Sequence, residues 1–156
     1  MRSIFRPNRY RDSSSIIDAL KERKVTIVGL SSNPEKASYQ VATFMMRQGY
    51  EIVPVNPGES EILGKKSYSN LKEANESEGP IKLVNVFRQP QHLIPVVLDS
   101  IEIGSEFLWF QLGVINEEAI SLAREAGIRC IVDKCCLLYT SPSPRDATLS
   151  RMPSSA

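Results

Sequence analysis

Short apolar runs alternate along the chain with segments whose apolar residues recur at helical spacing. The helical segments predict helices over 13–24, 39–49, 90–104 and 116–127, and the apolar runs predict strands over 25–30, 50–57, 82–87, 106–113 and 128–134. This alternation favours βαβ units and a parallel sheet. Because the strands are almost wholly apolar, both sheet faces must be covered. The expected fold class is α/β: a three-layer α/β/α sandwich, a Rossmann-like doubly wound parallel sheet of about five or six strands.

The remaining segments break this pattern. Residues 58–80 are polar, with a possible short strand over 65–69 and an acidic turn over 75–80. Residues 1–12 carry four arginines against Asp12, and the last 19 residues have three prolines and no apolar periodicity. We therefore expect a flexible basic arm over 1–12, one domain over 13–137 and a disordered or foreign tail over 138–156.

Charge, hydropathy and cysteine usage exclude several classes of protein. The formal net charge is +1, which offers no basic field for nucleic acid. The sequence holds no run of roughly 20 apolar residues that would cross a membrane. The cysteines Cys130, Cys135 and Cys136 have neither CxxC spacing nor a second ligand cluster, so a metal site or a disulfide framework is not expected. A cytoplasmic protein is expected; the arginine-rich start leaves an organellar location as the alternative. A protein partner stays unknown.

The loop after the first strand has the chemistry of a phosphate cradle. A glycine lets the backbone approach a ligand, and hydroxyls, free amides at a helix start and a cation favour an anion. The candidate residues are Gly29, Ser31, Ser32, Asn33, Lys36 and Ser38. Pro34 suits either a turn or the first position of the helix, and Ser38 is the other candidate cap. The spacing is not the GxGxxG fingerprint of dinucleotide-binding proteins, because Ser31 and Pro34 stand where the further glycines would be.

The ends of two later strands add further candidates. The second strand ends in Val55, Asn56 and Pro57, where a nicotinamide enzyme places an acidic residue on the ribose. Apolar side chains and an amide at this strand end suit an adenine ring better than they suit NAD. Phe87 and Arg88 leave the strand over 82–87, and Arg88 is placed to meet an anionic group.

Several of these motifs together are specific. They are VTIVGLSSNPEKASYQVATFMMRQGYEIVPVNP, ILGKKSYSNL, VNVFR, WFQLGVINEEA and AGIRCIVDKC. Through these motifs, over about 24–136, the chain resembles the stand-alone CoA-binding domain proteins. The fold of that family is the fold of the CoA-binding half of succinyl-CoA synthetase alpha. The resemblance implies a Rossmann-like fold that holds coenzyme A, with acyl-CoA possible, at residues 29–38, 55–57 and 87–88. Family members usually close with a run such as CIKIEH, whereas Cys135 is followed here by Cys136, Leu137, Leu138 and Tyr139.

No catalytic residue is expected. His92 has no nucleophile or carboxylate beside it in sequence, and Ser31 and Ser32 lack a His–Asp partner. The function expected is therefore CoA or acyl-CoA binding, with an NAD(P)-binding oxidoreductase-like protein or a non-binding interaction subunit as alternatives. A Gly29→Val variant is expected to abolish CoA binding while leaving the fold intact.

Overall fold

A computed structural model describes residues 12–111 and 115–132, and the side chains from Ile16 onward. Its main sheet is five-stranded and parallel throughout, in the order β3-β2-β6-β7-β8. The strands are β2 (Lys24–Val28), β3 (Glu51–Val55), β6 (Leu83–Val86), β7 (Phe107–Phe110) and β8 (Arg129–Val132). Each lies within a range that the apolar runs predict or begins one residue before it. Of the expected arm over 1–12, residues 1–11 lie outside the described residues, as does the expected tail over 138–156, whereas Asp12 is the first residue of a helix.

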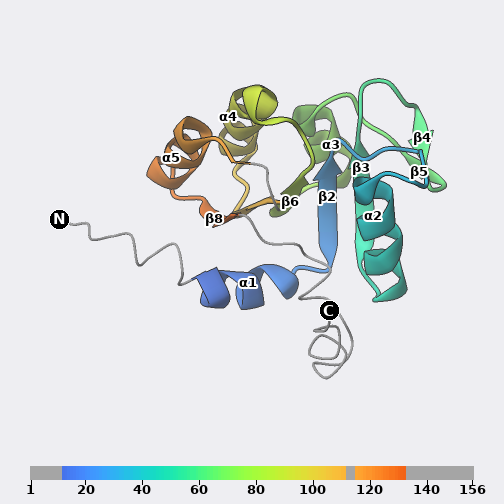
Figure 1. The fold of residues 1–156 in the computed structure, drawn as a ribbon, viewed down its shortest axis with the longest axis horizontal. Helices are drawn as coiled ribbons and strands as arrows, with labels where there is room; N and C mark the ends of the chain where they lie inside the picture. Colours follow the sequence, from blue (N-terminus) through green and yellow to red (C-terminus); the bar gives the residue numbers. More distant parts are fainter. Residues whose placement is uncertain (1–11, 112–114, 133–156) are drawn as a thin grey trace.

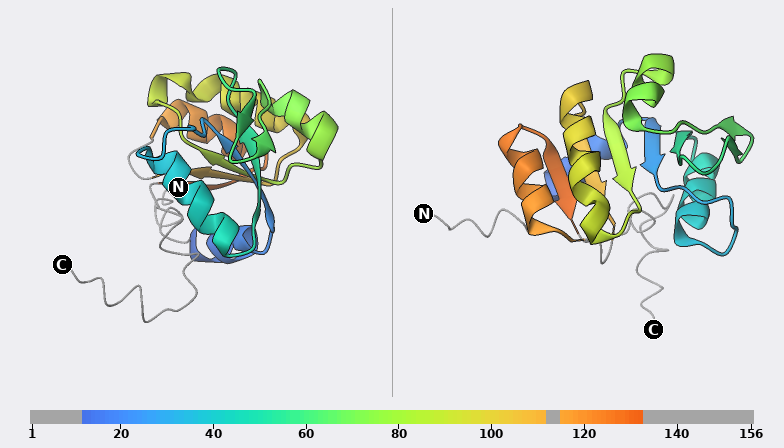
Figure 2. Two further views of the ribbon diagram at one scale, coloured as in Figure 1. Left: turned by 90° about the vertical axis from the view of Figure 1, so that its right-hand side faces the viewer. Right: turned by 90° about the horizontal axis from the view of Figure 1, so that it is seen from above.

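Helices cover both faces of this sheet (Figures 1 and 2). One face carries α1 (Asp12–Leu20) and α2 (Ala37–Arg47), and the other carries α3 (Leu71–Glu78), α4 (Leu93–Ile103) and α5 (Glu117–Glu125). A short 3₁₀ turn, η2 (Pro90–His92), precedes α4. The predicted three-layer α/β/α sandwich and its doubly wound parallel sheet are confirmed.

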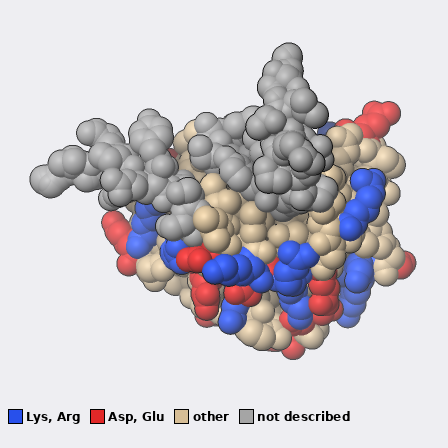
Figure 3. Space-filling model, turned by 90° about the horizontal axis from the view of Figure 1, so that it is seen from below, with Lys and Arg blue, Asp and Glu red and all other residues tan. Residues whose placement is uncertain are grey.

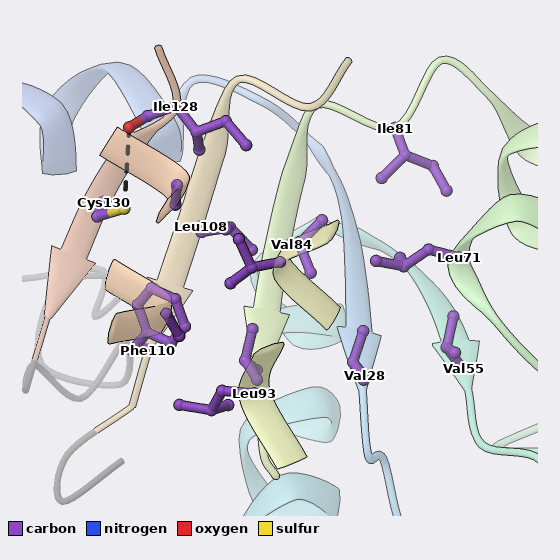
Figure 4. Packing of buried hydrophobic residues seen from close by; sticks show 14 of the residues in the cluster. Val28, Val55, Leu71, Ile81, Val84, Leu93, Leu108, Phe110, Ile128 and Cys130 are labelled. Carbon is purple, nitrogen blue, oxygen red and sulfur yellow. Dashed lines mark hydrogen bonds between the residues drawn. The ribbon is translucent and has the colours of Figure 1, made fainter. Parts of the chain in front are cut away.

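The alternation of side chains along each strand divides the core into two clusters. Val25 and Ile27 of β2 face α1 and α2, whereas Val28 faces α3 to α5. Figure 4 shows the second cluster, with residues of neighbouring strands side by side and with Leu71 and Leu93 reaching them from the helices. Every strand is therefore apolar on both faces, which explains the continuous apolar runs in the sequence.

The direction of chain winding reverses between β2 and β6. From β2 the chain crosses through α2 to β3 at one edge, and it then returns past β2 to β6 and continues through β7 to β8. In doubly wound sheets, ligands bind outside the carboxyl ends of the strands at such a reversal. The edge formed by the ends of β3, β2 and β6 is thus where a site is expected.

The segment between β3 and β6 contains one predicted strand together with elements that the sequence pattern did not predict. It forms an antiparallel pair, β4 (Glu61–Ile62) with β5 (Lys65–Lys66), and then α3. The expectation of an acidic turn over 75–80 is wrong, because residues 75–78 form the second half of α3. The strand expected over 65–69 is shorter, but its Tyr68 makes an isolated parallel bridge to Val55 and so extends the sheet beside β3.

Ion pairs join neighbouring elements at the amino ends of the strands. Figure 3 shows this face, on which acidic and basic side chains are interspersed. Asp18 of α1 lies 2.8 Å from Arg129 of β8, and this hydrogen-bonded guanidinium lowers the pKa of the carboxyl group. Exposed pairs of this kind each stabilise a fold only slightly. No helix among the described residues is both long and apolar enough to cross a bilayer.

Candidate functional site

A pocket of about 130 Å³ lies at the carboxyl edge where the winding reverses. Four of the predicted binding residues line it: Gly29, Val55, Pro57 and Arg88. They come from the ends of three adjacent strands, so the parallel sheet brings together positions that lie up to 59 residues apart in the sequence. The remaining walls come from α3 and α4, on one side of the sheet.

The lining of this pocket is mostly apolar with a few polar groups. Its apolar surface includes Val28, Val55, Leu71 and Val96. Arg88 supplies a cation and Asp99 of α4 a carboxylate. An apolar hollow with a small number of polar groups is the usual character of a small-molecule site.

Gly29 is required by the packing of β2 against β6. Its φ is +87°, and a Cβ atom there would clash with the carbonyl oxygen of Phe87 and lie 3.2 Å from Cδ of Arg88. The strand ends are joined by hydrogen bonds from the Gly29 N–H to the Val55 carbonyl at 2.9 Å and from the Phe87 N–H to the Val28 carbonyl at 2.8 Å. The expectation that Gly29→Val leaves the fold intact is therefore wrong, because its side chain would meet backbone.

Most polar groups of the loop over 29–38 hold the loop itself. The Ser31 N–H donates to Oγ of Ser38, and Oγ of Ser31 accepts from the Asn33 N–H, both at 3.0 Å. Oδ1 of Asn33 accepts from the Glu35 N–H at 2.9 Å. Ser38 is buried within α2 and is not its cap, so that alternative is wrong. Pro34 lies in the turn before the helix, as the first of its two alternatives predicts.

The first turn of α2 has backbone N–H groups that no described residue accepts. No hydrogen bond among the described residues uses the N–H groups of Ala37, Ser38 and Tyr39. The residue that precedes them, Lys36, is exposed and makes no ion pair within the described part of the chain. Free amides and a cation at a helix start form an electropositive position next to the strand ends.

Asn56 joins the two loops that border the site. Its Nδ2 donates to the Leu30 carbonyl at 2.8 Å, and its Oδ1 accepts from the Gly58 N–H at 2.8 Å. Its own N–H donates to the Tyr68 carbonyl at 2.9 Å. The side chain of Asn56 therefore fixes the end of β3 relative to the end of β2, and Pro57 follows it into the pocket wall.

Ser32 and Phe87, two further predicted residues, do not line the pocket. Oγ of Ser32 donates to Oε2 of Glu59 across the gap between the same two loops, at 2.6 Å. Phe87 is partly buried and packs against the cluster under α1 and α2. Arg88, like Lys36, makes no ion pair with any described residue.

Sequence reasoning missed the part of the pocket that comes from α3 and α4. The residues concerned are Ser69, Asn70, Leu71, Pro95, Val96 and Asp99. A signal for the α3 wall is present in the sequence, because Asn70 and Glu73 have the spacing of a helix cap. Oδ1 of Asn70 accepts from the Glu73 N–H at 2.9 Å, and Oε1 of Glu73 accepts from the Ser69 N–H at 3.1 Å.

Among the described residues, the remaining candidates His92 and Cys130 show no arrangement typical of catalysis. His92 is exposed at the start of α4 and makes no side-chain cap there. Cys130 is buried, whereas Cys135 and Cys136 lie outside the described residues. Within 12–111 and 115–132, no group of three or more His, Cys, Asp or Glu could hold a metal ion.

Known proteins are similar to this chain in both sequence and fold. YneT of Bacillus subtilis (strain 168), described as uncharacterized, is 41% identical over 115 residues, which cover 74% of this chain and 83% of YneT. The solved structure of a hypothetical protein from Pyrococcus horikoshii OT3 has 30% sequence identity and a TM-score of 0.73, and the match covers 78% of this chain and 84% of that one.

A larger enzyme subunit contains a similar region. Subunit alpha of the ADP-forming acetate–CoA ligase II of Pyrococcus furiosus is 24% identical over 137 residues, which cover 81% of this chain and 29% of the subunit. The sequence model of a family described as the CoA binding domain matches residues 23–141. That range includes all five strands and the whole of the candidate site. The chain is a member of the CoA binding domain family.

Proposed function

We propose that this protein binds coenzyme A, free or as an acyl-CoA, at the carboxyl edge of its sheet, and that binding rather than catalysis is its role. The observation that carries the proposal is the pocket at the reversal point, with Arg88 in its wall. Membership of the CoA binding domain family supports the choice of ligand.

The residues present fit the chemistry of CoA. The ligand is highly anionic, and Lys36, Arg88 and the open N–H groups at the start of α2 are suited to phosphate. Val55 and Pro57 offer an apolar surface for the adenine ring. When bound, CoA would supply a thiol that carries acyl groups as thioesters.

A role in binding rather than catalysis is supported by the partners of two hydroxyls in the loop that follows β2. Oγ of Ser31 accepts a backbone N–H, and Oγ of Ser32 donates to Glu59. Neither hydroxyl is paired with His92, so a serine nucleophile activated by histidine has no support here.

The NAD(P) alternative has less support at the end of β3. Residue 56, directly after this strand, is an asparagine whose amide already contacts Leu30 and Gly58. A carboxylate that would hold ribose hydroxyls is usual at such a strand end in nicotinamide enzymes.

Calorimetric titration of the full chain with CoA, acetyl-CoA, dephospho-CoA, NAD and NADP tests the proposal. We expect saturable one-to-one binding of CoA and no binding of the nicotinamide nucleotides at the same concentrations. Native mass spectrometry of the purified protein should show a mass increase after incubation with CoA. NAD binding without CoA binding would overturn the proposal, and no binding at all would favour an interaction subunit.

We place this binding activity in the cytoplasm. An organelle entered through the arginine-rich start is the alternative. Fractionation of cells that express the full chain with a C-terminal tag distinguishes the two, because transit peptides are removed on import and shorten the protein.

A further inference from the structure

The hydrogen bond between Ser32 and Glu59 places a negative charge beside the loop over 29–38, which we call the phosphate loop. Oγ of Ser32 and Oε2 of Glu59 lie 2.6 Å apart, a distance typical of a hydroxyl that donates to a carboxylate. Glu59 has no ion pair within the described part of the chain. Its charge is therefore offset by hydrogen bonding and solvent and by no adjacent cation.

Ser32 is the serine of this loop that reaches outward. The hydroxyls of Ser31 and Ser38 accept N–H groups of the loop and so hold its backbone. The hydroxyl of Ser32 instead crosses to the segment that follows β3. It is the loop hydroxyl that an incoming anion can reach, and in this structure a carboxylate holds it.

The position of Glu59 is fixed by the same turn that borders the pocket. The Glu59 N–H donates to the Asn56 carbonyl at 3.2 Å, and Oδ1 of Asn56 accepts from the Gly58 N–H at 2.8 Å. Asn56 also contacts the carbonyl of Leu30, two residues before Ser32. Because both loops are tied at Asn56, the backbone of Glu59 cannot move far from the loop over 29–38 without breaking these bonds.

We infer that Glu59 is a specificity-determining residue, which lowers the affinity of the site for anionic ligands and does so more strongly as the ligand carries more charge. This inference rests on the proposed function and adds a residue that acts against binding. A phosphate that approaches Ser32 must displace the carboxylate and is repelled by it. CoA carries a 3′-phosphate that dephospho-CoA lacks, so the penalty is larger for CoA.

The variant Glu59→Gln tests this inference cleanly. Glutamine has the same shape and keeps an oxygen that accepts from Ser32, so only the charge is removed. We expect CoA to bind about fivefold more tightly and dephospho-CoA about twofold more tightly, as judged by the strength of one screened charge interaction near the surface. Calorimetry measures both affinities, and thermal unfolding of each variant checks the fold.

A matched control is Glu61→Gln, which removes a carboxylate two residues further along, on the exposed side of β4. We expect this variant to change both affinities less than Glu59→Gln does. In about 0.5 M NaCl the gain from Glu59→Gln should shrink, because salt at that concentration screens charges within a few ångströms.

The outcomes separate this inference from the proposed function. Equal affinities in the parent chain and in Glu59→Gln, weaker binding by that variant, or the same gain in Glu61→Gln would each overturn the role of Glu59 while leaving CoA binding intact. Absence of CoA binding in the parent chain and in both variants would overturn the proposed function and, with it, this inference.

Discussion

The carbonyl oxygen of Phe87 fills the space that a side chain on residue 29 would need. Gly29 also has a φ of +87°, a conformation that residues with a Cβ atom rarely adopt. These two constraints meet where β2 and β6 leave the sheet, next to the pocket. The sequence suggested that Gly29 lets a ligand approach the backbone. In the structure, this glycine is needed first so that the ends of β2 and β6 can lie close together.

Gly29→Ala should destabilise the fold strongly. We expect a loss of about 2–4 kcal/mol in the free energy of unfolding, from backbone strain together with the clash against Phe87. Urea denaturation measures it. Gly104→Ala is the control, because Gly104 has a φ of +78° and open space around it, so it carries strain without a clash. Equal losses in the two variants would contradict the steric argument.

Asn56→Ala should loosen the two loops at the site. Loss of its bonds to Leu30 and Gly58 should cost about 1–2 kcal/mol in stability and weaken CoA binding. Asn56→Asp should do the same, because a carboxylate oxygen would then face the Leu30 carbonyl. Asn33→Ala removes one exposed acceptor from the same region and should cost less. A larger loss at Asn33 would argue against the role given to Asn56.

Arg88→Gln should weaken CoA binding with little change in stability. Arg88 lines the pocket and has no ion pair among the described residues, so its removal leaves no buried charge without a partner. We expect about a tenfold loss of affinity by calorimetry and an unchanged thermal midpoint. Arg124→Gln, in the last turn of α5, serves as the control. Unchanged binding by Arg88→Gln would place the ligand's phosphates elsewhere.

Tyr68→Phe should change how stability depends on alkaline pH. The hydroxyl of Tyr68 donates to Oε2 of Glu78 at 2.8 Å, and this bond, with burial, raises the pKa of the phenol. The stabilisation is present below the unfolded pKa of about 10 and is lost as pH rises through the higher folded value.

Below that pH, Tyr68→Phe should be less stable than the parent chain by about 1 kcal/mol. The difference should narrow as the parent chain loses stability above pH about 10. Urea denaturation at a series of pH values measures this, with Tyr39→Phe as the control. A difference that stays constant through the alkaline range would show that the bond to Glu78 does not depend on the phenol's proton.

The sequence predicted the sheet because each strand is buried on both faces. In β7, Phe107 and Trp109 enter one core cluster and Leu108 and Phe110 enter the other, so apolar residues run without interruption. Helix α3 escaped prediction for the opposite reason. Of its eight residues only Leu71 and Ala74 are buried, which is too few to show a helical period.

The candidate site was predicted in part. Glycine, proline and arginine at strand ends indicated the edge of the sheet at which the pocket lies, because topology alone brings those ends together. Asn56 and Ser38 have residue types suited to a ligand, but the structure uses both to hold loops. Which face of α4 turns toward the strand ends depends on packing, so Val96 and Asp99 could not be identified from residue type.

The pocket and the start of α2 lie on opposite sides of the sheet. The pocket is walled by α3 and α4, whereas α2 packs on the other face, and the carboxyl ends of β2 and β6 lie between them. A helix with its side chains is about 10–12 Å in diameter, so the two helical layers are well separated. A small anion could therefore engage one side only. A molecule that engages both must be elongated and must bend over the sheet's rim at Gly29, where the chain itself presents no side chain.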